Sequence, residues 1–129
     1  MKAFRLLALA LALAALACST TKVQNFAGTI PGGLTHDQVR EAITEAAESR
    51  NWTVKPLNDS TLLATLVIRS RHSATIEIPY DTTRYALNYK DSTNLDYKDG
   101  EIHENYNAWV EKLDRTIQKD LHRAAAGKR

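Results

Sequence analysis

One stretch of the sequence gathers side chains that could bind or transform a small molecule. Residues 94–110 read NLDYKDGEIHENYNAWV and hold one histidine, three asparagines and four acidic side chains. An imidazole can act as a general acid or base, and amides and phenols can orient a ligand through hydrogen bonds. A loop over 91–105 could therefore form the site of a small-ligand carrier or a hydrolase. Its walls would be Tyr89, Tyr97, His103 and Asn105.

The same stretch also fits a purely architectural role. Lys98, Asp99 and Gly100 are typical of a turn, because glycine adopts a positive φ without strain. His103 or Asn105 is placed to cap the free amides at the start of a following helix. Under this interpretation the stretch joins the last helix to the sheet. Both interpretations stay open at the level of the sequence.

No catalytic or metal-binding motif accompanies this stretch. Cys18 is the only cysteine, and neither an HExxH nor a GxSxG motif is present. A zinc site built on paired cysteines and a disulfide framework are both excluded. We predict a protein that is not an enzyme, with no catalytic residue, no metal and no cofactor. The four histidines are scattered, at His36, His72, His103 and His122.

A second group of candidate binding residues lies in the middle of the chain. Apolar and polar side chains alternate over 61–71, which places Arg69 and Arg71 on the outer face of a predicted strand. A basic face could meet an anionic glycan, a lipid headgroup or an acidic partner. Alternatively, its charges are simply solvated and keep the sheet from aggregating. The basic residues of this face would be Lys55, Arg69, Arg71, Arg84 and Lys90, with Glu77 as the main acidic neighbour.

The first residues have the pattern of a secretory signal. Lys2 and Arg5 precede eleven consecutive leucines and alanines at 6–16. A helix that spans a bilayer needs about 20 apolar residues. The run is therefore too short for a permanent span and fits a cleaved signal peptide over 1–17.

The residues AALAC at 14–18 resemble the lipobox of bacterial lipoproteins, with Ala15 where leucine is more common. The resemblance implies cleavage between Ala17 and Cys18 and lipidation of Cys18, on its thiol and on the new amino terminus. Two or three acyl chains would anchor the protein stably to a membrane. Ser19 after the cysteine resembles the pattern sorted to the outer membrane of Gram-negative bacteria, with the domain facing the periplasm.

Removal of the signal changes the charge balance. The full chain has 17 Lys+Arg against 15 Asp+Glu. Cleavage after Ala17 removes Lys2 and Arg5, which leaves 15 against 15. Because nucleic-acid binding needs a basic surface, a near-neutral mature domain predicts no nucleic-acid partner.

The hydrophobic pattern predicts one domain over 31–123. A tether over 18–30 precedes it, and a flexible tail over 124–129 follows it. Thr35 and Gln38 form a capping box that starts a helix ending near 49, and an apolar stripe predicts a second helix over 104–123. Between them, alternating residues predict four strands with turns at 59–60, HS (72–73) and DTT (81–83). We expect a two-layer α+β fold, a four-stranded antiparallel meander with both helices on one face, in the order α-β-β-β-β-α.

The runs NYKDSTNLDYKDG (88–100) and IHENYNAWVEKLDRTI (102–117) resemble a set of small uncharacterised proteobacterial periplasmic lipoproteins. The resemblance implies the compartment but no catalytic residue. The leading hypothesis is a lipid-anchored outer-membrane protein that acts as a non-catalytic envelope binding or scaffolding module. Its partner would be an envelope protein or an anionic glycan. The alternative is the small-ligand carrier or hydrolase that uses the 91–105 loop.

Overall fold

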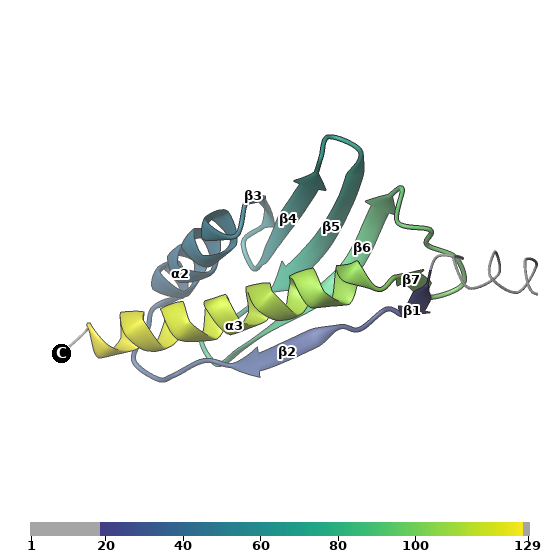
Figure 1. Cartoon of the computed structure of the whole chain (residues 1–129). Coiled ribbons are helices and arrows are strands. Elements are labelled where there is room, and N and C mark those ends of the chain that lie inside the picture. Colours follow the sequence, from purple (N-terminus) through teal and green to yellow (C-terminus); the bar gives the residue numbers. More distant parts are fainter. Residues whose placement is uncertain (1–18, 128–129) are drawn as a thin grey trace, which may run out of the picture.

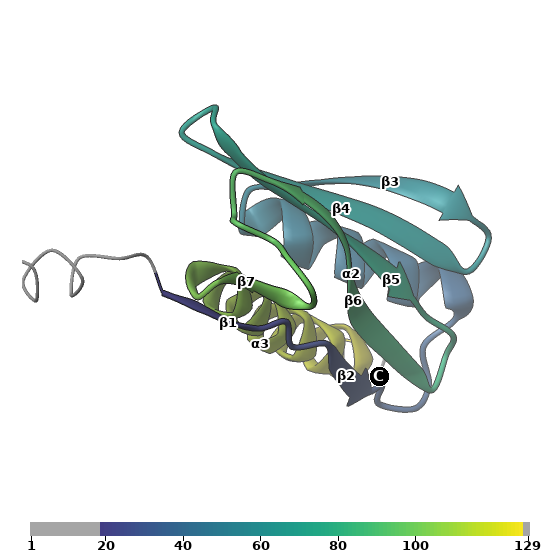
Figure 2. The same ribbon diagram turned by 90° about the vertical axis from the view of Figure 1, so that its right-hand side faces the viewer.

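The computed structural model describes residues 19–127. Figure 1 shows a helix pair packed against a twisted sheet, and Figure 2 shows the same arrangement from the side. Among these residues, no helix is long and apolar enough to cross a membrane. The elements in chain order are β1 (Thr20–Lys22), β2 (Phe26–Thr29), α2 (His36–Ser49), β3 (Trp52–Asn58), β4 (Thr61–Ile68), β5 (His72–Pro79), β6 (Arg84–Thr93), β7 (Glu101–His103) and α3 (Asn105–Ala126).

The main sheet has five antiparallel strands in the order β2-β6-β5-β4-β3. The predicted four-stranded meander and the order α-β-β-β-β-α are therefore wrong, because β2 adds an edge strand before the first helix. In its register, Phe26 faces Leu87 and Gly28 faces Tyr85. A four-residue strand that contains a glycine has too little alternation to stand out in the sequence.

A second, two-stranded sheet pairs β1 with β7. Asn107 on α3 fixes the chain between β1 and β2. Its Oδ1 accepts a hydrogen bond from the backbone N–H of Gln24 (2.9 Å), and its Nδ2 donates to the backbone carbonyl of Lys22 (2.8 Å). Val23 N also donates to Gly100 O (2.9 Å). Residues 20–29, which we predicted to be a tether, are thus held in the fold.

The hairpin between β4 and β5 turns earlier than predicted. Ile68 pairs with His72, so the connection consists of Arg69, Ser70 and Arg71 rather than the HS pair at 72–73. Arg69 and Ser70 have positive φ, 56° and 55°, and Arg71 N donates to Ile68 O (3.1 Å), which makes them the central residues of a β-turn. Neither residue is glycine, and for this reason the sequence pattern did not mark the turn.

The core lies between the helices and the inward row of the sheet. Helix α2 begins with the predicted capping box, in which Gln38 N donates to Thr35 Oγ1 (3.2 Å) and Thr35 N donates to Gln38 Oε1 (2.9 Å). Each large apolar side chain that is fully buried contributes about 1.5–3 kcal/mol. Helix α3 continues to Ala126, and Ala124 and Ala125 are half-buried against the core, so residues 124–126 of the predicted tail are helical. The fully buried side chains of α3 are Tyr106, Val110, Leu113, Ile117 and Leu121.

A polar bridge joins α3 to β2 and β6. The buried Tyr85 hydroxyl donates a short hydrogen bond to Asp114, and Gln118 Nε2 donates to the Tyr85 oxygen (2.8 Å) and to Thr29 O (3.2 Å). Burial, and secondly the bond to Asp114, raise the pKa of Tyr85 far above its usual range, so its phenol remains a donor. The bridge passes over Gly28, where a Cβ atom would lie 2.6 Å from the Tyr85 oxygen.

Gly28→Ala tests this packing. A methyl group at position 28 must displace Tyr85 and Gln118, so we expect the free energy of unfolding to fall by about 2 kcal/mol. Urea denaturation followed by circular dichroism measures the change. Gly32→Ala is the matched control, since nothing lies within 4 Å of a Cβ at that position. Equal stability of the two variants would contradict the packing described here.

Candidate functional site

The tyrosines predicted as ligand walls pack on each other instead. Tyr89 and Tyr97 are stacked with ring centroids 4.5 Å apart, and Tyr106 meets Tyr89 edge-on at 5.5 Å. The Tyr89 hydroxyl is hydrogen-bonded to Ser92 Oγ (2.8 Å). Tyr97 is 47% exposed on the outside of this stack. Neither Tyr89 nor Tyr97 lines the described pocket to which His103 contributes, which differs from the expected arrangement.

Three other predicted residues do come together. Arg69, His103 and Asn105 line one pocket of about 280 Å³. Residues that the sequence did not single out complete the lining, and this cavity is called the His72–His103 pocket below. Its full lining is Ile68, Arg69, His72, Asn94, Leu95, His103, Asn105 and Trp109.

Backbone-directed hydrogen bonds hold the pocket together from three parts of the chain. His72 Nδ1 lies 2.8 Å from Asn94 O, and Asn94 Nδ2 donates to Arg71 O (2.6 Å). His103 N donates to Leu95 O (2.8 Å). The β4–β5 turn, the segment after β6 and the start of α3 thus meet at one end of the molecule (Figure 1). These contacts are long-range in sequence, and for this reason His72 and Asn94 were missed.

The two histidines of the pocket have opposite hydrogen-bonding roles. A carbonyl oxygen carries no proton, so His72 Nδ1 donates to Asn94 O. His103 Nδ1 instead accepts from Asn105 N (3.1 Å), which caps the first turn of α3 and places the ring proton on Nε2. The Nε2 atom of His72 is therefore a hydrogen-bond acceptor, whereas His103 offers an Nε2–H donor. His103 thus accepts from the first amide of α3, although it precedes the N-cap residue, Glu104, whose own side chain makes no capping hydrogen bond.

Arg69 reaches the pocket because of the turn. On a continuous strand it would lie on the outer sheet face, as we predicted. The left-handed conformation at position 69 interrupts the strand, and the side chain lines the His72–His103 pocket. Such a conformation is unfavourable for a long side chain, and the surrounding hairpin must hold it. Arg71 is exposed, and it contributes its backbone carbonyl to Asn94 rather than its guanidinium to the pocket.

A second hollow adjoins the pocket at Trp109. It measures about 220 Å³ and shares Ile68 and Trp109 with the first. The two hollows together are called the Trp109 groove below. Trp109 itself is half-buried, with its apolar ring at the border between core and solvent. The second hollow is lined by Ser49, Arg50, Asn51, Trp52, Leu66, Ile68, Trp109 and Lys112.

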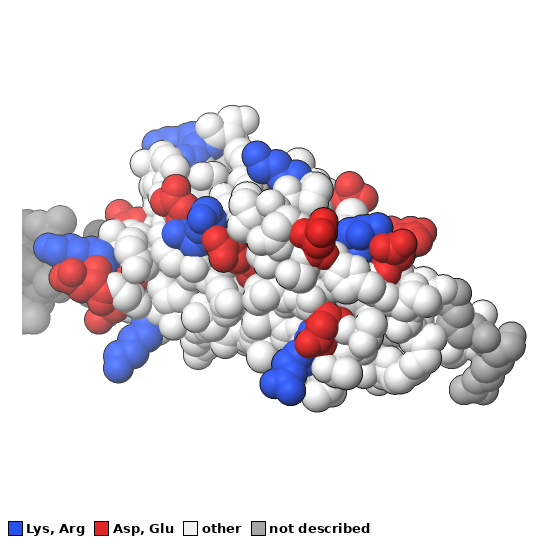
Figure 3. All heavy atoms as spheres, turned by 180° about the vertical axis from the view of Figure 1, so that it is seen from behind, with Lys and Arg blue, Asp and Glu red and all other residues white. Residues whose placement is uncertain are grey.

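The open sheet face does not carry the continuous basic patch that we considered. Figure 3 shows isolated lysines and arginines among acidic and uncharged side chains. Lys90 is paired with Glu77 at 2.9 Å, which removes one of the predicted cations from ligand binding. Val67 and Leu57 are the large apolar side chains exposed on β4 and β3. Of the predicted basic residues, Arg69 alone lines the Trp109 groove.

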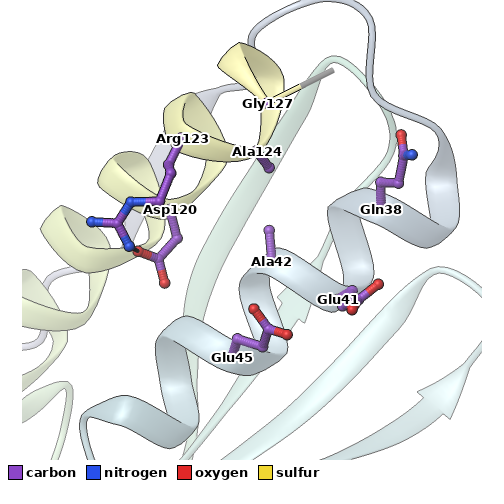
Figure 4. Close-up of a pocket in the computed structure, with 8 residues that line it drawn as sticks. All are labelled: Gln38, Glu41, Ala42, Glu45, Asp120, Arg123, Ala124 and Gly127. Atoms are coloured by element: carbon purple, nitrogen blue, oxygen red, sulfur yellow. Dashed lines mark ion pairs between the residues drawn. The ribbon is translucent and has the colours of Figure 1, made fainter. Parts of the chain in front are cut away.

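A further groove of about 360 Å³ lies between α2 and α3 (Figure 4). Its charged lining consists of Glu41, Glu45 and Asp120 with one cation, Arg123, which lies 3.6 Å from Asp120. The part of the chain that the structure describes contains no group of three or more His, Cys, Asp or Glu side chains that could hold a metal. This groove is an acidic, solvated seam between two packed helices.

Cys18 and Ala17, the predicted lipidation and cleavage residues, lie outside the described residues. Comparison of the chain with protein-family models, with curated proteins and with solved structures finds no match. The candidate site therefore depends on the geometry of the Trp109 groove alone.

The role of His103 as a cap is tested by two substitutions. His103→Ala removes the acceptor for the Asn105 amide, and we expect it to lower the free energy of unfolding by about 1 kcal/mol. His103→Asn keeps an acceptor at nearly the same position and should retain most of that stability. Both are measured by urea denaturation, and an equal loss in the two variants would show that the side chain does not act as a cap.

Proposed function

We propose that this protein is a lipid-anchored, non-catalytic binding module on the periplasmic side of the outer membrane of a Gram-negative bacterium. In this proposal the Trp109 groove is its ligand site. The observation that carries the proposal is the chemistry of the groove. It combines an aromatic face with amide, imidazole and cationic donors at one end of a rigid domain.

The lining favours binding over covalent catalysis. In the described chain, the His72–His103 pocket is lined by no serine, threonine, cysteine, lysine, tyrosine or carboxylate. An imidazole without a neighbouring nucleophile or carboxylate partner lacks the usual arrangement for acyl or phosphoryl transfer. Ser49 lines the second hollow, but its hydroxyl donates to Ala46 O (2.7 Å).

The short distance from the lipobox cysteine to the fold supports a surface-bound module. Strand β1 begins at Thr20, so Ser19 is the one residue between Cys18 and the first strand. Two residues span at most about 7 Å. Lipidation of Cys18 would therefore hold the β1–β7 end of the domain directly at the membrane, rather than on the longer tether that the sequence suggested.

A small-ligand carrier is the second candidate, because Asn94, Leu95, His103 and Asn105 of the 91–105 loop do line a ligand-sized pocket. The two candidates differ in what occupies the groove in cells. A scaffold would present it to a macromolecule that stays in the envelope, and a carrier would hold a diffusible ligand.

Cys18→Ser tests the anchor. We expect the variant to leave the membrane fraction and appear in the soluble periplasmic fraction, because the serine hydroxyl does not replace the thiol as the lipid acceptor. Fractionation and immunoblotting of the full chain measure this. Ser19→Ala is the control and should stay with the membrane. Membrane retention of Cys18→Ser would refute the lipid anchor.

Site-specific crosslinking in intact cells tests where the partner binds. A photoreactive residue at Asn105, which is exposed and lines the groove, should give adducts with an envelope protein or glycan. The control position is Leu57, which is 49% exposed on β3. Adducts from position 57 alone would move the binding surface to the open sheet face, and adducts from neither position would remove the support for a scaffold.

A further inference from the structure

The Lys and Arg side chains that line the Trp109 groove are not balanced by carboxylates. Its two hollows are lined by three cations, Arg50, Arg69 and Lys112, and within residues 19–127 no aspartate or glutamate lines either hollow. None of these cations forms an ion pair with another described residue. Arg50 Nε donates to Thr116 Oγ1 (2.9 Å), which leaves the two terminal nitrogens of its guanidinium as donors for a ligand. Because three cations and no described carboxylate line the groove, it is a local site of positive potential.

The shape and the uncharged lining restrict the size of the ligand. Hollows of about 280 and 220 Å³ are suited to one or two small rings, whereas a folded partner needs a larger, flatter surface. Trp109 lies where the hollows join and offers an apolar ring face for stacking. Asn105 and the Nε2–H of His103 add hydrogen-bonding groups for hydroxyls at the rim.

His72 and His103 offer different ring atoms to a ligand. The Nδ1 proton of His72 is committed to Asn94 O, so its Nε2 lone pair can accept a hydrogen bond from a hydroxyl group. His103 Nδ1 accepts from Asn105 N, so its Nε2–H is a donor.

We propose that the Trp109 groove binds an acidic saccharide, with a sugar ring stacked on Trp109, its carboxylate or phosphate group held by Arg69, and a ring hydroxyl donating to His72 Nε2. The proposal rests on the groove being the ligand site of the proposed binding module, and it names the chemistry of that ligand. A planar guanidinium suits the paired oxygens of either acid group. Hydroxyls of the same ring reach the asparagine and histidine donors.

The test is isothermal titration calorimetry on the full chain purified in detergent. The acidic probes are trigalacturonic acid and glucose 6-phosphate, and the neutral probe is a galactose trisaccharide of the same linkage as the first. We expect at least one acidic probe to bind about tenfold more tightly than the neutral one.

Four variants assign the interaction to residues. Arg69→Asn removes the charge while keeping a residue that tolerates positive φ, and it should weaken acidic-probe binding about tenfold. His72→Leu, which removes the ring acceptor, should weaken binding of the acidic probe, whereas His103→Gln, which keeps an amide donor, should retain most of it. Lys119→Gln is the control, because Lys119 is an exposed cation of α3 that lines neither hollow, and it should change nothing.

Three results would overturn the acidic-saccharide proposal. The first is that neither acidic probe binds better than the neutral trisaccharide. The second is that inorganic phosphate alone binds as tightly as both acidic probes, which would make the groove a simple anion site. The third is that Arg69→Asn and Lys119→Gln behave alike. If crosslinks form at position 105 and the acidic probes fail, the binding module stands and only this ligand chemistry is lost.

Discussion

Helix α3 buries Tyr106, Val110, Leu113, Ile117 and Leu121 completely, and the position of every other element depends on this contact. The stripe covers the inward row of the sheet and also the side of α2. At its start, Asn107 holds the chain between β1 and β2, and His103 caps its first turn. Farther along, Asp114 and Gln118 fix β2 and β6 through Tyr85. One helix therefore combines the hydrophobic packing of the core with the polar contacts that hold β1, β2 and β6 in place.

The same helix explains why the groove lies where it does. Trp109 lies at the edge of the apolar stripe of α3, so its ring is partly buried against the core and partly exposed. The β4–β5 turn and the segment after β6 end at this level, and the hydrogen bonds of Asn94 with the His72 ring and with Arg71 O tie them to each other. Trp109 thus belongs both to the packing around the core and to the lining of the groove. The burial that stabilises α3 also orients the aromatic face of the groove.

The features predicted from the sequence are those encoded locally. The capping box of α2, the stripe of α3 and the turn at Asp99 and Gly100, whose φ values are 51° and 81°, follow from short-range patterns. Strand β2 was missed because its pairing with β6 joins distant segments and Gly28 has no side chain to show a pattern. The pocket was predicted in part, through Arg69, His103 and Asn105. The turn at Arg69 and Ser70, which brings Arg69 to His72, depends on strand register and not on turn-forming residues.

The most direct measurement is a proton–nitrogen correlation spectrum of the histidine rings, recorded with and without trigalacturonic acid. The account predicts two opposite tautomers near neutral pH, with the proton of His72 on Nδ1 and that of His103 on Nε2. Added acid saccharide should shift the Nε2 signal of His72 and leave the tautomers of both rings unchanged. The same tautomer for both rings, or no response of His72 to the ligand, would contradict it.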